Sequence, residues 1–156
     1  MPIKLKELLK TALSLRRVAI KSRYQVKIPK VTQPNLSCMV FGNGPSLDGD
    51  IREQFDLIKN IDTFCVGRFA ESDLYKMVQP KYYVFADPML WSTEAPEQML
   101  LMRNTLFARI KNDTSWSLLI CVPFEAKEFL NDIFSNSPNI SLVFYNNLPL
   151  WEVSVY

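Results

Sequence analysis

Histidine is absent from this chain of 156 residues. Its absence excludes every Ser-His or Cys-His triad, every histidine metal site and histidine acid–base catalysis within the chain. Cysteine is scarce: the three cysteines include no Cys-x-x-Cys pair, which argues against a disulfide scaffold or a zinc site and fits a reducing, cytoplasmic compartment. No apolar run reaches the roughly 18–20 residues that span a bilayer, and no signal peptide is evident.

Charge is distributed unevenly, although the formal net charge is only +2. Residues 1–30 hold nine of the 18 Lys and Arg residues and one acid, Glu7, so the remainder is acidic, with nine basic against fifteen acidic residues. We therefore expect a basic helical arm and connector at 1–34 and a folded domain at 35–156. This domain has no basic stripe, so no nucleic-acid partner is expected.

The arm is predicted to form an amphipathic helix over residues 3–21. Basic residues occupy one face, and Arg16 interrupts the apolar face opposite. The apolar face comprises Leu5, Leu8, Leu9, Ala12, Leu13, Leu15, Ala19 and Ile20. Such a helix can lie peripherally on an anionic membrane, here the inner membrane face, or it can pack on the body of the protein or on a partner. The sequence leaves both interpretations open.

From residue 37, short apolar runs alternate with helical periodicity. The predicted strands are 38–41, 62–66, 82–86, 118–122 and 140–145, with the longest helix of the body at 95–111. This rhythm is typical of βαβ units. We predict a Rossmann-like α/β fold of about five parallel strands with helices on both faces, preceded by the N-terminal helix. The exposed edge of the sheet and the basic helix would both permit homo-oligomers.

Three loops follow predicted strands at the edge where parallel sheets bind ligands. The first, Gly42–Leu47, reads Gly-Asn-Gly-Pro-Ser-Leu, and its glycines permit a tight turn and a close approach to a phosphate. The second contains Gly67 and Arg68, whose guanidinium suits phosphate or carboxylate. The third contains Asp87, which could accept hydrogen bonds from sugar hydroxyls or, with water, hold a metal ion.

Each loop also has an ordinary structural interpretation. Gly42–Leu47 can be a tight turn, since it matches neither the Walker A motif nor the dinucleotide fingerprint. Arg68 can pair at the surface with Glu71 or Asp73, and Asp87 can begin a turn before a proline.

Asp48 and Asp50 form an Asp-x-Asp motif that could hold a metal bridging a sugar diphosphate. The motif stands at the predicted start of a helix, where acids cap free N–H groups and favour the helix dipole. We therefore expect Asp50 to cap the helix, and we assign no metal site.

In this order, the three loops resemble the N-terminal half of bacterial cell-surface glycan enzymes. The motifs are Gly42–Leu47, then Gly67-Arg68-Phe69 with Tyr75 in the following helix, then Lys81 to Pro88. The families are the bacterial sialyltransferases with a single Rossmann-like domain and the related 6-hydroxymethylpterin diphosphokinase-like and motility-accessory glycosyltransferase-like families. The shared layout covers roughly residues 36–150.

The resemblance implies a site for a nucleotide-sugar donor, CMP-linked in the sialyltransferases. There the first loop cradles the nucleotide, and Asn43 would hydrogen-bond its phosphate or ribose. The candidate nucleotide-binding residues are Gly42, Asn43, Gly44, Ser46, Gly67, Arg68 and Asp87. Where the family has asparagines in the second and third loops, this chain has Gly67-Arg68 and Asp87. A carboxylate near an anionic donor is unfavourable unless Arg68 or a cation such as Mg²⁺ compensates, which leaves another nucleotide-sugar open.

The same resemblance implies that a catalytic half is missing. In those enzymes the histidine base and the tyrosines near the leaving phosphate lie beyond the fifth strand, so this chain resembles a truncated or reduced member. The catalytic residues are unknown, and Asp87 is the one candidate base.

The function expected from the resemblance is a glycosyltransferase-like protein that binds a nucleotide-sugar and a glycan acceptor in cell-surface polysaccharide or lipopolysaccharide synthesis. One alternative is a catalytically inactive domain that binds a nucleotide or a partner protein. A further alternative is a pterin diphosphokinase-like enzyme, which would need ATP and Mg²⁺.

Overall fold

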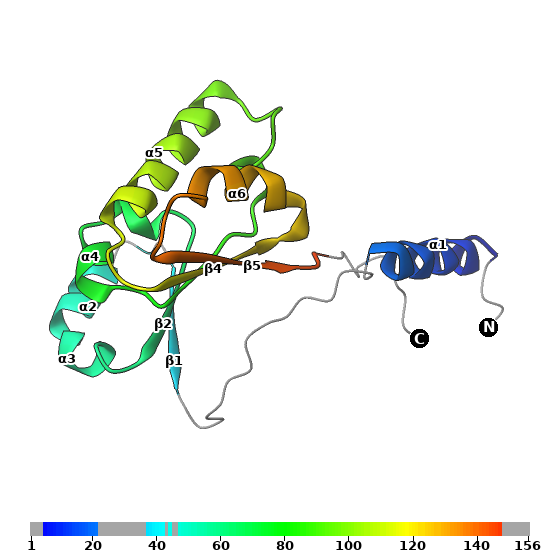
Figure 1. Cartoon of the computed structure of the whole chain (residues 1–156). Coiled ribbons are helices and arrows are strands. Elements are labelled where there is room, and N and C mark those ends of the chain that lie inside the picture. The colour runs from blue at the N-terminus through cyan, green and yellow to red at the C-terminus, as the bar shows by residue number, and fades with distance from the viewer. Residues whose placement is uncertain (1–4, 22–36, 43, 45–46, 148–156) are drawn as a thin grey trace.

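The computed structural model describes residues 5–21, 37–42, 44 and 47–147, in which strands and helices alternate as predicted (Figure 1). The strands are β1 (Cys38–Phe41), β2 (Asp62–Val66), β3 (Tyr82–Val84), β4 (Leu118–Pro123) and β5 (Ile140–Tyr145). The α-helices are α1 (Leu5–Lys21), α2 (Leu47–Glu53), α3 (Phe55–Ile58), α4 (Leu74–Val78), α5 (Glu97–Asp113) and α6 (Lys127–Phe134). Short 3₁₀ helices are η1 (Phe69–Glu71), η2 (Pro88–Leu90) and η3 (Phe124–Ala126).

All five strands are parallel and lie in the order β1-β2-β3-β4-β5. The Rossmann-like α/β class, the five parallel strands and the helix before them are confirmed. Because neighbouring strands are consecutive in the chain, each connection adds its strand on the same side of the previous one. Right-handed crossovers then place all connecting helices on one face of the sheet.

The distribution of buried residues agrees with a sheet covered on one face. Alternate strand residues, such as Cys65, Tyr83 and Ile120, are fully buried in one cluster with side chains from α2 to α6. The residues between them, such as Phe64 and Val84, belong neither to this cluster nor to the partly buried side chains packed against it. The expectation of helices on both faces therefore does not hold for the described residues.

Two observed boundaries, the start of α2 and the end of β3, differ from the predicted ones. Helix α2 begins at Leu47, so Asp50 lies inside the helix and does not cap it. The loop after β1 therefore ends earlier than the position of the acids suggested. Strand β3 ends at Val84, two residues before the predicted end, although the Phe85 N–H still donates to the Cys121 carbonyl of β4 at 3.0 Å.

Helix α1 contributes no side chain to the core of the sheet or to the residues packed against it, and in Figure 1 it stands apart from the strands. Leu8, Leu9, Leu13, Leu15 and Ile20 remain 50–58% exposed on it. Within the described residues, no helix is long and apolar enough to cross a membrane.

Candidate functional site

The loops after β1 and β2 line a common hollow of about 320 Å³ at the carboxyl end of the sheet. They meet because the two strands are adjacent and parallel, with Phe41 in register with Cys65. The hollow is lined by Gly42, Gly44, Leu47, Asp48, Arg68, Phe69, Glu71, Ser72 and Leu74. The structure thus brings three of the predicted site residues, Gly42, Gly44 and Arg68, to one cavity.

The glycines leave space in this hollow. A Cβ atom added at Gly42 or Gly44 would meet no atom within 4 Å. Neither residue has the positive φ that would require glycine for the turn itself. The space beside both glycines is therefore open, so a phosphate can approach their backbone closely.

Gly67 has a different role. Its φ of 59° lies in the left-handed region, where a side chain would be strained. The Tyr83 hydroxyl donates a hydrogen bond to the Gly67 carbonyl at 2.9 Å and accepts one from the Ala70 N–H at 3.0 Å. A fully buried tyrosine of β3 thus fixes the loop that carries Arg68.

The Arg68 side chain is held at the rim of the hollow by Glu71. Its Nε donates to Glu71 Oε1 at 2.9 Å, and a second nitrogen pairs with the other carboxylate oxygen. These hydrogen bonds, and then the charge of Glu71, raise the pKa of Arg68 above its ordinary value. The surface pair that the sequence offered as the alternative for Arg68 is formed.

Asp48, the second acidic residue that lines the hollow, is also paired with an arginine. Asp48 accepts a hydrogen bond from Arg52 Nε at 2.9 Å, one helical turn further along α2. The two carboxylates of the hollow, Asp48 and Glu71, therefore each have an arginine partner. Within the described part of the chain, no group of three or more Cys, Asp or Glu side chains is placed to hold a metal ion.

Asp87 does not line the hollow. Its exposed carboxylate accepts a hydrogen bond from the Met89 N–H at 3.0 Å and so caps η2. This is the turn-initiating role that the following proline suggested. Asn43 and Ser46, the remaining predicted binding residues, lie outside the described residues.

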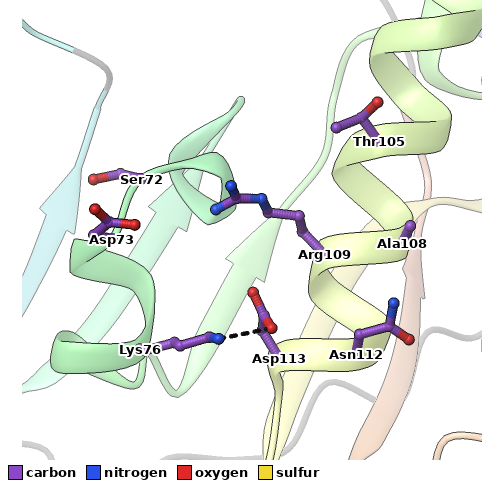
Figure 2. A pocket seen from close by; sticks show the side chains of 8 residues that line it. All are labelled: Ser72, Asp73, Lys76, Thr105, Ala108, Arg109, Asn112 and Asp113. Carbon is purple, nitrogen blue, oxygen red and sulfur yellow. Dashed lines mark ion pairs between the residues drawn. The ribbon is translucent and has the colours of Figure 1, made fainter.

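A larger groove of about 670 Å³ runs between α4 and α5 (Figure 2). Figure 2 shows Lys76 directed from α4 toward Asp113 of α5, and their charged atoms are 2.9 Å apart. Arg109 extends from α5 toward the turn before α4 and donates to the Glu71 carbonyl at 3.1 Å. The groove holds two basic and two acidic side chains, the second acid being Asp73, so its charges balance and favour neither an anion nor a cation.

Two structural roles near the hollow were not predicted. Tyr83 lies in the predicted strand 82–86, and nothing in the sequence indicates that its hydroxyl supports the loop after β2. Glu71 was considered only as a surface partner of Arg68, yet its carbonyl also anchors Arg109. Such contacts join residues 13 or more positions apart, so local patterns do not reveal them.

Comparison of the chain with protein-family models, curated proteins and solved structures found no match. The geometry of the hollow and the resemblance of its loops therefore remain as the guides to what it binds.

Proposed function

We propose that this protein binds the nucleotide of a nucleotide-sugar donor in the hollow between the β1 and β2 loops and acts as a glycosyltransferase-like protein of cell-surface polysaccharide synthesis. The observation that carries the proposal is the convergence of the Gly42–Gly44 loop and Arg68 on one cavity at the carboxyl edge of a parallel sheet. The cavity is at the lower end of the range for small-molecule sites, about 300–1,000 Å³, which suits a mononucleotide.

The lining supports this choice of ligand. Buried Phe69 and Leu74 give the hollow an apolar floor, and Ser72 adds a hydroxyl. The charge of Asp48 is compensated by its pair with Arg52. Arg68 is 56% exposed and uses two of its three nitrogens on Glu71. Its remaining guanidinium N–H groups can therefore donate to a phosphate while the pair with Glu71 stays in place.

A second candidate function is nucleotide binding without catalysis. It is favoured because the candidate carboxylates already have hydrogen-bond partners. A general base must be free to accept a proton from the acceptor hydroxyl. Asp48 and Glu71 are each held by an arginine, and Asp87 caps η2 outside the hollow. The pterin diphosphokinase-like alternative is weakened, because it would need metal-binding carboxylates that the described residues do not group together.

The proposed location is the cytoplasmic membrane face, with α1 in peripheral contact with anionic lipid. The support is the combination of exposed leucines and basic residues on one helix. This contact would hold the hollow near a lipid-linked acceptor.

The test is a thermal-shift and calorimetric titration with CMP, CDP, UDP, GDP and ATP, with and without Mg²⁺. A ligand that binds only the folded state raises the melting temperature. We expect one nucleotide to do so, with the effect lost in Arg68→Ala. The matched controls are Lys59→Ala, which removes an exposed cation outside the hollow, and Asp87→Asn, which preserves a hydrogen-bond acceptor.

The controls should respond as the unmodified chain does. The proposed site would be overturned if no nucleotide raised the melting temperature, or if the increase were the same in Arg68→Ala. Release of free nucleotide from the matching nucleotide-sugar in the presence of acceptor would distinguish a transferase from a binding domain.

A further inference from the structure

Among the described residues, one face of the sheet is an apolar surface on which no helix packs. By strand register, its positions alternate with those of the core. We call this set the open face: Cys38, Val40, Asp62, Phe64, Val66, Tyr82, Val84, Leu119, Cys121, Ser141, Val143 and Tyr145. Most of these side chains are apolar, and Phe64 and Tyr82 stack across it with ring centroids 4.3 Å apart.

Parallel sheets are normally covered on both faces, because helices of the crossover connections pack on each. Here the consecutive strand order places those helices on one face, and none of the open-face residues joins the core. Some other segment is therefore needed to cover the open face.

Helix α1 has the matching surface. Its exposed leucines and Ile20 form an apolar stripe without a place in the core. A helix of 17 residues is about 25 Å long, and five strands spaced about 4.8 Å apart form a sheet about 20 Å wide. The sixteen residues from 22 to 37 that join α1 to β1 can extend over about 50 Å, enough to reach any part of the sheet.

The charges also match. Arg16 interrupts the apolar stripe, and a cation there requires an acidic partner when the stripe is covered. Asp62 is the one acid among the open-face positions, and its carboxylate, already 2.8 Å from Lys81, has lone pairs for a second cation. We propose that α1 of the same chain folds onto the open face, with its apolar stripe on the strands and Arg16 directed to Asp62.

Cys121 provides a natural reporter of this contact. It lies on β4 within the open face, in register with Val84 of β3 and Val143 of β5. The experiment measures maleimide labelling of Cys121 in the Cys38→Ser chain, which lacks the exposed thiol. Its one other cysteine, Cys65, is buried. Mass spectrometry locates the label, and circular dichroism verifies that each variant stays folded.

We expect Leu9→Gln with Leu13→Gln to accelerate labelling about tenfold, the change produced when a segment that covers the site about 90% of the time is released. Leu101→Gln is the matched control, because Leu101 is an exposed leucine on α5 that belongs to neither surface. Equal Cys121 labelling rates in the Cys38→Ser chain with and without the two leucine substitutions would overturn the proposal.

A double-mutant cycle tests the orientation of α1. Arg16→Gln and Asp62→Asn should each accelerate labelling, and together they should add little beyond either one alone. Lys81→Gln is the control, since it removes the other partner of Asp62. Fully additive effects would overturn the Arg16–Asp62 contact.

Analytical ultracentrifugation at the labelling concentration determines whether the contact is made within one chain. A monomer with protected Cys121 supports the proposal. A dimer whose protection falls on dilution would show α1 docked on a second copy and would overturn docking within the chain. These outcomes do not depend on nucleotide binding, so the proposed function and this inference can fail separately.

Discussion

At the scale of single residues, Tyr83 connects the core to the candidate site. Its ring is fully buried on the covered face of the sheet, next to Tyr75 and Phe85. Its hydroxyl donates to Gly67 and accepts from Ala70. Removing one oxygen atom would leave both backbone groups without this partner.

Tyr83→Phe is therefore expected to lower the free energy of unfolding by about 1–3 kcal/mol, the cost of leaving buried polar groups unpaired. Urea denaturation of the purified chain measures this change. Tyr82→Phe is the matched control, because the neighbouring tyrosine lies on the open face and should lose less than half as much. Equal losses of unfolding free energy in the two variants would show that the Tyr83 hydroxyl stabilises the fold no more than the Tyr82 hydroxyl does.

The same residue predicts a pH dependence. Burial raises the pKa of Tyr83 above the ordinary value of 10.0, so the folded state favours the protonated phenol. The resulting stabilisation is complete below pH 10.0 and is lost as the pH rises above it, because the unfolded chain then releases the proton first.

Phenylalanine cannot ionise, so the difference in stability between the unmodified chain and Tyr83→Phe should shrink by about 1.4 kcal/mol between about pH 7 and pH 11. Burial also raises the pKa of Cys65, but that effect is common to both proteins and cancels. A difference that stays constant with pH would mean that Tyr83 ionises equally in both states.

Among the helices and strands, the features that depend on the local sequence pattern were predicted correctly. Apolar runs placed the five strands within two residues of their observed ends, and the helical spacing of Leu106 and Ile110 predicted α5. The start of α2 was predicted four positions late, because its acids lie within the first turn and do not cap the helix. Since parallel strands end at one edge, the meeting of the first two loops was predictable, whereas the Tyr83 support was not.

The turn after β2 depends on glycine at position 67. Gly67→Ala should lower the free energy of unfolding by about 1–2 kcal/mol, because a side chain at φ 59° is strained. Gly49→Ala is the matched comparison: it lies inside α2, its added Cβ meets nothing within 4 Å, and it should stabilise the chain by about 0.5–1 kcal/mol. Denaturation of the two variants should therefore give changes of opposite sign, and a change of the same sign would contradict the backbone argument.

In the whole molecule, the order of the strands determines which faces of the sheet are covered, and the local sequence pattern does not determine this. The alternation of strands and helices is the same for a sheet covered on one face and for one covered on both. In a two-sided sheet the chain reverses direction across the sheet, and ligands bind at that reversal. The consecutive order here has no reversal within the described strands, so the candidate site depends on the β1 and β2 loops alone.

The two roles proposed for α1 compete. The apolar stripe of α1 cannot contact lipid and the open face at the same time. Anionic vesicles should therefore draw α1 from the sheet and accelerate Cys121 labelling in the Cys38→Ser chain toward the rate of the Leu9→Gln/Leu13→Gln variant.

Neutral vesicles should have little effect, and added salt should weaken the response, because the basic face of α1 supplies the attraction to anionic lipid. The Leu9→Gln/Leu13→Gln variant, already open, should label at one rate with or without vesicles. Binding of the unmodified chain to vesicles with no change in Cys121 labelling would show that α1 does not cover the sheet, whereas failure to sediment with anionic vesicles at low salt would remove the membrane role alone.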